Sequence, residues 1–168
     1  MAKLGRIPLC HAEHDRAALR RRDDLWLASM RNDPATRVIA VRSASELLVD
    51  DVPCLATVDR SALPAEAELT FLGLDASGAV FVCDADVQTL AMALPTGSTF
   101  SELRSLGSTL PAGDAGLAVQ AVAMVGWHRR HRFCGSCGAP TVVEEAGHSR
   151  RCSGCGAQHF PRTDPAVI

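Results

Sequence analysis

Three features are absent or scarce in this sequence of 168 residues, and each bears on what the protein can bind or where it functions. No apolar run approaches the ~20 residues that a membrane-spanning helix needs, so we expect no membrane partner. Residues 1–22 are charged and contain no continuous apolar segment, so no secretory signal is visible. Tyrosine is absent and aromatic residues make up only 4% of the chain, which leaves few side chains that stack on nucleic-acid bases.

A large excess of charge is also absent from the chain as a whole. The formal net charge is −2, so bulk charge does not predict a polyanion-binding protein. The charges are unevenly distributed, since residues 1–126 carry a net charge of −5 and residues 127–168 a net charge of +3. We interpret the arginines of the second segment mainly as a balance for the thiolates described next.

Four of the seven cysteines form two matched pairs with the spacing C-x₂-C-x₁₄-C-x₂-C, namely Cys134, Cys137, Cys152 and Cys155. A gap of two residues lets both sulfurs of a pair reach one metal ion at about 2.3 Å, and four thiolates satisfy a tetrahedral zinc ion. Four protein ligands leave no open position for a reactive water. The spacing therefore predicts one structural zinc per chain rather than a catalytic one.

The segment between the pairs fits a short hairpin, with strands at 141–144 and 148–151 and a turn at Ala146-Gly147. Gly138 and Gly156 follow the two pairs, where we expect positive φ and amides that point towards the thiolates. Disulfides, free thiols or a redox dithiol are the alternatives for the four cysteines, and two copies around a hairpin favour the metal.

The other three cysteines, Cys10, Cys54 and Cys83, follow no pattern, and we interpret them as reduced thiols. Reduced thiols beside a structural zinc site, without a secretory signal, are typical of a cytoplasmic protein.

Upstream of the cysteine pairs the pattern predicts an α+β domain with a mostly antiparallel sheet. A helix is expected over residues 13–31, with Leu19, Trp26 and Met30 sharing one stripe. Short β-like runs follow at 37–42, 46–50, 54–59, 69–74 and 79–83, and residues 75–78 join the last two as a hairpin loop.

Two further helices are expected. Thr99 and Glu102 have the spacing of a capping box, which predicts a helix that starts at Thr99. Asp114 is the expected N-cap of a helix over 117–131, whose core positions are Leu117, Ala121, Met124 and Val125. No flexible linker separates this helix from the first cysteine pair, so we expect the two to be rigidly coupled. His128 and His131 lie three residues apart on it, and we favour packing or surface roles for them over metal ligation.

The region around the cysteines closely resembles the zinc ribbon of the Nudix-type NADH pyrophosphatases. The resemblance is carried by WHRRHRFC at 127–134, CGAPT at 137–141, RC at 151–152, CG at 155–156 and HFPRTDPAVI at 159–168. Weaker similarity, in DAGLA at 114–118 and FLG at 71–73, extends it upstream. The apolar run at 166–168 begins like a buried strand, from which we expect that a further domain follows in the family pattern.

The resemblance implies three parts: a degenerate Nudix-like domain over 1–126, a zinc ribbon over 127–160, and the start of a missing catalytic Nudix domain at 161–168. It implies hydrolysis of NADH or NAD to nicotinamide mononucleotide and AMP, with removal of NAD caps from RNA in some members. It also implies Mg²⁺ or Mn²⁺ in the catalytic domain, and a homodimer.

The sequence departs from the family at the catalytic motif. The Nudix box, G-x₅-E-x₇-R-E-x₂-E-E-x-G, occurs nowhere, and Asp50-Asp51 is the densest carboxylate pair of the middle section. Because pyrophosphate hydrolysis needs clustered carboxylates to hold Mg²⁺, we assign no catalytic residue and expect the chain alone to be inactive.

Three hypotheses remain open. The chain is the scaffold of an NAD(H) diphosphatase, or a non-catalytic module that binds RNA or a protein partner, or a structural piece that dimerises. An RNA-binding module would use the arginines and aromatic residues around the ribbon: Arg129, Arg130, Arg132, Arg150, Arg151, Trp127, Phe133 and Phe160.

Overall fold

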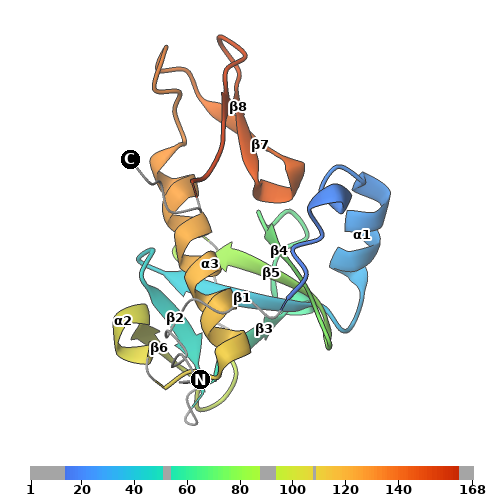
Figure 1. Ribbon diagram of the computed structural model, residues 1–168, viewed down its shortest axis with the longest axis vertical. Helices are drawn as coiled ribbons and strands as arrows, with labels where there is room; N and C mark the ends of the chain where they lie inside the picture. Colours follow the sequence, from blue (N-terminus) through green and yellow to red (C-terminus); the bar gives the residue numbers. More distant parts are fainter. Residues whose placement is uncertain (1–13, 51–53, 88–93, 108, 163–168) are drawn as a thin grey trace, which may run out of the picture.

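The computed structural model describes residues 14–50, 54–87, 94–107 and 109–162. Within them the chain folds into one larger, mostly antiparallel sheet with helices on both faces, and a small three-stranded sheet beyond the end of the longest helix (Figure 1). The α+β class expected from the sequence is therefore confirmed. Cys10 and Asp51 lie outside the described residues.

The larger sheet has the strand order β4-β5-β1-β2-β6, and β3 also pairs with β1. Its strands are β1 (Arg37–Arg42), β2 (Glu46–Val49), β3 (Thr57–Asp59), β4 (Thr70–Asp75), β5 (Gly78–Asp84) and β6 (Thr99–Glu102). All pairs are antiparallel except β1 with β5. The β2 and β3 strands lie end to end along β1, because β3 pairs with Arg37–Ile39 and β2 with Val41 and Arg42.

Apolar side chains fill both faces of this sheet, as expected for strands that alternate between two layers. On one face, Ile39, Val41 and Leu47 pack against helix α3 (Ala112–Arg130) through Met124. The four residues predicted as the core stripe of this helix are all buried: Leu117, Ala121, Met124 and Val125. On the other face, Phe71 and Phe81 pack edge to face and cover Leu27 of helix α1 (Asp24–Asn32).

The first helix is shorter than predicted. A 3₁₀ turn, η1 (Ala18–Arg20), precedes α1, and the Asp23 carboxylate caps α1 by accepting a hydrogen bond from the Trp26 amide at 3.0 Å. A capping aspartate starts a new helix because it satisfies an amide that has no partner within the helix. Leu19 is 98% exposed, so it does not share a stripe with Trp26 and Met30.

The prediction that a helix starts at Thr99 is wrong. Residues Thr99–Glu102 form β6, which pairs along the whole of β2, and only Leu103–Leu106 form the short helix α2. The capping pattern is local, whereas pairing with the open edge of β2 satisfies backbone groups of both strands, so the tertiary contact decides the conformation.

Asp114 does not cap α3, which begins at Ala112. The Asp114 carboxylate lies in the first turn and accepts a hydrogen bond from the Leu55 amide at 3.0 Å, linking the helix start to the strand layer. A carboxylate in the first turn also favours the positive end of the helix dipole.

The small sheet contains β7 (Thr141–Glu144), β8 (Ser149–Cys152) and β9 (Gln158–His159) in that order, all antiparallel. The predicted hairpin is confirmed, although its turn takes three residues, η3 (Glu145–Gly147), and its second strand begins at Ser149 rather than His148. A further 3₁₀ turn, η2 (Arg60–Ala62), follows β3. No helix among the described residues combines the length and apolar character needed to cross a membrane.

Candidate metal centre

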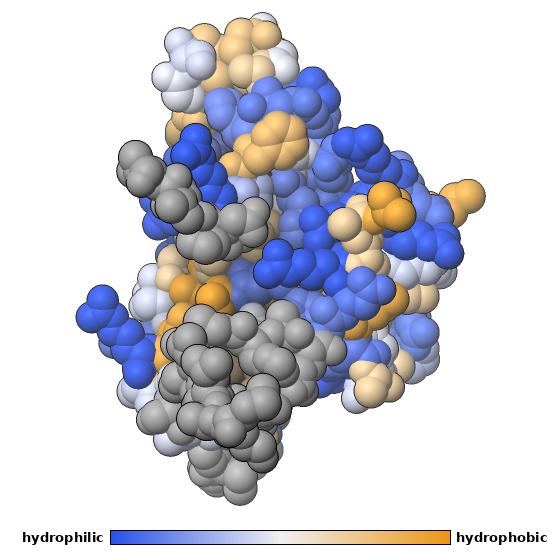
Figure 2. All heavy atoms as spheres, viewed as in Figure 1, coloured by the Kyte–Doolittle hydropathy of each residue, from blue (hydrophilic) through white to orange (hydrophobic). Residues whose placement is uncertain are grey.

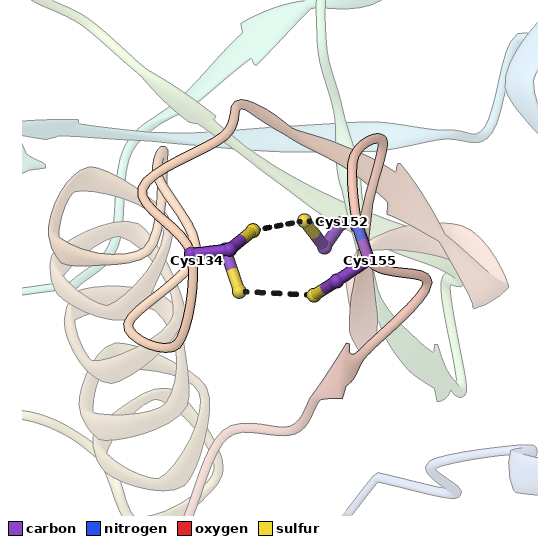
Figure 3. A group of neighbouring side chains, drawn as sticks. Cys134, Cys152 and Cys155 are labelled. Atoms are coloured by element: carbon purple, nitrogen blue, oxygen red, sulfur yellow. Dashed lines mark hydrogen bonds between the residues drawn. The ribbon is translucent and has the colours of Figure 1, made fainter.

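The four predicted ligands converge at the tip of the small sheet. Their sulfur atoms all lie within 4.8 Å of one another, and two of the six separations are 3.7 Å (Cys134 to Cys155) and 3.4 Å (Cys137 to Cys152). Cys134 comes from the loop after α3, and it faces Cys152 and Cys155 at the end of β8 (Figure 3). A tetrahedral zinc site with 2.3 Å bonds places its sulfurs about 3.8 Å apart. The arrangement therefore fits one tetrahedral metal ion.

The two cysteine loops have the same backbone geometry, which explains the matched sequence pattern. In each, the glycine after the second cysteine donates its amide to the carbonyl of the first, at 2.8 Å for Gly138 to Cys134 and 3.2 Å for Gly156 to Cys152. These glycines have φ of 76° and 74°, a region that residues with a Cβ rarely occupy. The predicted positive φ is thus confirmed.

The amides that face the sulfurs are not those of the glycines at 138 and 156. Ser136 donates to the Cys134 sulfur at 3.4 Å, and Gly154 and Cys155 donate to the Cys152 sulfur at 3.3 and 3.4 Å. The Ser136 and Cys137 amides hold the pKa of the Cys134 thiol well below its ordinary value, and the Cys155 amide lowers the pKa of Cys152. These donors stabilise thiolates, the form that binds metal.

Disulfide bonding does not describe this cluster. A disulfide joins its sulfurs at about 2.0 Å, whereas the two shortest contacts given above are 3.4 and 3.7 Å. Every described cysteine is free. Cys83 is buried in the larger sheet, where burial raises the pKa of its thiol to about 12, so it is protonated and unreactive.

His128 and His131 stand apart from the four sulfurs and have packing roles. His131 stacks on Trp127, with ring centroids 5.1 Å apart, and its Nδ1 lies 2.9 Å from the Trp127 carbonyl. His128 lies 3.0 Å from the Thr70 hydroxyl through Nε2 and 2.9 Å from Arg150 through Nδ1. Because the guanidinium only donates, Nδ1 accepts and the His128 proton resides on Nε2, which donates to Thr70.

The small sheet is seated directly on β4. His148 donates from Nε2 to the Phe71 carbonyl at 2.6 Å, and the turn at Gly147 touches Thr70. A Cβ on Gly147 would lie 2.5 Å from the Thr70 hydroxyl, and its φ is 96°, so only glycine fits this contact. We call the contacts of His128, Gly147 and His148 with Thr70 and Phe71 the ribbon junction.

Both junction histidines are neutral. Burial, followed by the nearby Arg150 charge, lowers the pKa of His128 to about 4. Burial also lowers the pKa of His148 to about 4, and the charges of Arg21 and Arg16 act in the same direction. The hydrogen bonds to Thr70 and Phe71 are therefore made by uncharged rings at neutral pH.

The arginines around the ribbon differ in their partners. Arg129 forms ion pairs with Asp84 and Asp86, and Arg151 pairs with Glu144 at 2.7 Å. Arg150 is buried and donates to the Thr141 hydroxyl and carbonyl at 2.7 and 3.0 Å. Among the described residues, the side chains of Arg130 and Arg132 form no ion pair. Three of the five arginines considered for RNA binding are therefore committed to internal contacts.

Two family models match this chain, one over the larger sheet and one over the small sheet. Residues 129–160 match the NADH pyrophosphatase zinc ribbon domain, and residues 15–127, well over half of the chain, match the NADH pyrophosphatase-like rudimentary NUDIX domain. The chain belongs to the NADH pyrophosphatase-like family. The resemblance seen in the sequence is thus confirmed, and the larger sheet with α3 is the rudimentary NUDIX domain of this family.

Curated relatives match over shorter stretches. The chain is 43% identical over 74 residues to the NAD-capped RNA hydrolase NudC of Deinococcus radiodurans, covering 44% of this chain and 26% of that protein. It is 35% identical over 97 residues to the human mitochondrial NAD(P)H pyrophosphatase NUDT13, covering 58% of this chain and 27% of that protein. Human NUDT12, an NAD-capped RNA hydrolase, is 38% identical over 63 residues, which cover 33% of this chain and 14% of that protein. The chain spans only about a quarter of these relatives, or less.

Sequence reasoning missed the ribbon junction of this rudimentary NUDIX domain. Phe71 and His148 are 77 positions apart, so no local pattern reveals their hydrogen bond. The sequence predicted a rigid connection between the helix and the first cysteine pair, but only because no flexible linker separates them. It did not predict the contacts with β4. The predicted boundary between residues 126 and 127 falls inside α3, whose Trp127 packs into the core of the larger sheet.

Proposed function

We propose that this chain is the N-terminal and zinc-ribbon part of an NAD(H) diphosphatase, in which it binds one structural zinc and scaffolds the enzyme. The observation that carries the proposal is the four-sulfur cluster at the tip of a ribbon within a chain of the NADH pyrophosphatase-like family. Cys134, Cys137, Cys152 and Cys155 are the proposed zinc ligands. A closed site of four thiolates supplies folding stability rather than a reactive water.

The activity proposed for the whole protein is hydrolysis of NADH or NAD to nicotinamide mononucleotide and AMP, with NAD-capped RNA as the further substrate. The names of the bacterial and human relatives support this substrate class. Mg²⁺ or Mn²⁺ and a homodimer complete the proposal, and they rest on the family resemblance alone. A cytoplasmic location is also proposed, and it rests on the reduced thiols beside the zinc site.

Residues 1–168 by themselves are proposed to be inactive. Among the described residues, the four cysteines are the only group of three or more His, Cys, Asp or Glu residues whose ligand atoms converge. The Nudix-box spacing is also absent from the sequence. Hydrolysis of a pyrophosphate assisted by Mg²⁺ needs carboxylates gathered around the ion.

The test compares two preparations in an assay with NADH and Mn²⁺. Purified 1–168 is expected to contain one zinc per chain and to release no AMP. Protein isolated from its own cells with an antibody against the ribbon is expected to release AMP from NADH. AMP release by 1–168 would refute the inactivity, and an inactive native preparation would refute the proposed enzyme.

The alternative, an RNA-binding module, is favoured by one observation: Arg130, Arg132, Phe133 and Phe160 are exposed around the ribbon. Single-stranded RNA would then bind with an affinity that falls steeply with salt, and Arg130→Gln with Arg132→Gln would abolish the binding. Absence of binding at low salt excludes this alternative.

A further inference from the structure

A groove of about 730 Å³ lies where the ribbon meets the rudimentary NUDIX domain, away from the four sulfurs. Its walls come from the last turn of α1, the segment before β4, the start of β4, the end of β5, the last turns of α3 and one side of the ribbon. Pockets that bind small molecules have volumes of roughly 300–1,000 Å³. On the face seen in Figure 2, hydrophilic residues gather between the ribbon and the larger sheet.

One part of the groove is apolar and ends in an aromatic ring. Leu69, Val82, Val125 and Val143 line it, and Phe133 contributes a side chain that is 62% exposed. A ring at the wall of a groove offers a flat surface on which a planar base stacks.

The groove also carries guanidiniums that form no ion pair with any described carboxylate. Arg129 and Arg150 line it but are engaged by Asp84 and Thr141. Arg31 and Arg132 line it as well, and neither side chain makes a hydrogen bond or an ion pair with any other described residue. The Arg31 Nε is buried without an acceptor. Burial and then the charge of Arg60 lower the pKa of Arg31, so an anion placed here would relieve unfavourable interactions.

Two exposed carboxylates, Glu66 and Glu68, share the groove with these arginines. Burial lowers the pKa of the Arg150 guanidinium, and the charge of Glu68 opposes this shift. A groove with both signs of charge does not suit a simple polyanion. It suits a ligand with a phosphate for the guanidiniums and an amino or amide group that donates to a carboxylate.

We propose that this groove binds a nucleoside phosphate, with the base on Phe133 and the phosphate held by Arg31 and Arg132. The ligand class is one that carries an exocyclic amino or amide group, as adenosine monophosphate does. The site goes beyond the proposed scaffold and zinc-binding role, because binding here requires no hydrolysis and no catalytic domain.

To test this site, the zinc-loaded protein (residues 1–168) is titrated with AMP, adenosine and inorganic phosphate. Binding is followed through the amide chemical shifts in NMR spectra. AMP is expected to bind saturably and at least tenfold more tightly than adenosine or phosphate, with shifts confined to the groove. No saturable AMP binding, or phosphate binding as tight as that of AMP, would overturn the proposal. NADH hydrolysis is measured separately, so failure of the proposed enzyme leaves this result unaffected.

Variants assign the binding to the groove. Arg31→Gln and Arg132→Gln are each expected to weaken AMP binding about tenfold, since each removes a charge-assisted hydrogen bond. Phe133→Leu keeps an apolar side chain without the ring and is expected to weaken AMP but not phosphate. The matched control is Arg104→Gln, because Arg104 is an exposed arginine on α2, outside the groove. Equal loss in Arg104→Gln would show unspecific charge attraction and overturn the site, and zinc content and melting temperature verify that each variant is folded.

Discussion

The rudimentary NUDIX domain and the ribbon are stabilised in opposite ways. The domain buries apolar side chains on both faces of its sheet, among them Phe71, Phe81 and Met124 with almost no exposure. The described ribbon residues that are buried are mostly polar, glycine or metal-ligating, such as Thr141, Ser149, Arg150, Cys134 and Cys152. Its valines on β7 are exposed. The ribbon therefore depends on its metal, whereas the domain depends on its apolar core.

Loss of a metal ligand is expected to have the largest effect and to fall on the ribbon alone. Cys137→Ser should release zinc and unfold residues 131–160, because structural zinc contributes about 10–16 kcal/mol to folding in small modules. Zinc quantification and amide NMR spectra check this, with resonances of the larger sheet retained. Cys54→Ser is the control, since Cys54 is a free thiol outside the cluster. Unchanged zinc content and ribbon resonances in Cys137→Ser would contradict the comparison.

A cavity in the core is expected to have the complementary effect. Met124→Ala removes a fully buried side chain between α3 and the sheet and should cost about 2–5 kcal/mol of unfolding free energy. Urea unfolding followed by circular dichroism measures the loss. Zinc stoichiometry should remain one per chain, and its loss would mean that the two regions do not fold by separate means.

Acidification is expected to act where the two regions meet. The folded-state pKa of about 4 for His128 and for His148 lies below the unfolded value of about 6.5, so the unfolded chain binds more protons between these values. Stability is thus present above pH 6.5 and falls as the pH drops towards 4, by up to about 3 kcal/mol for each ring.

Melting temperatures between pH 7.5 and 4.5 test this, with zinc content measured at each pH. His148→Gln should lower stability at pH 7.5 and flatten the pH dependence. A variant with the same slope as the parent would show that His148 does not contribute to it.

Crowding at the turn is expected to have a smaller effect. Gly147→Ala places a methyl group 2.5 Å from Thr70 at a positive φ and should cost about 1–3 kcal/mol. Gly135→Ala is the matched control, because a Cβ there meets no atom within 4 Å and should change the unfolding free energy by less than about 0.5 kcal/mol. Thermal unfolding compares the two, and an equal effect would refute the close contact.

The ribbon could be predicted almost completely from sequence because its information is local. The two C-x₂-C pairs, their glycines and the hairpin between them lie within 23 residues, and each constraint acts between near neighbours. The strand at Arg37–Arg42 was predicted with its exact bounds for a similar reason, since its apolar run is continuous.

The failures occurred where distant partners decide the outcome. Thr99–Glu102 reads as a helix start, yet the edge of β2 turns it into a strand. Asp114 reads as a cap, yet the Leu55 amide lies within its reach. The groove and the ribbon junction combine residues that lie far apart in the chain, so no short stretch of sequence displays them.

The contact between Gly147 and Thr70 has an evolutionary consequence. Because the hydroxyl and methyl groups of Thr70 occupy the space that a side chain at position 147 would need, the sizes of these two residues are linked. Relatives that have a larger residue at the turn should have a smaller one on the strand beneath it, together with a turn that avoids the positive φ of Gly147. An alignment of the family would reveal this exchange as paired substitutions between the two modules.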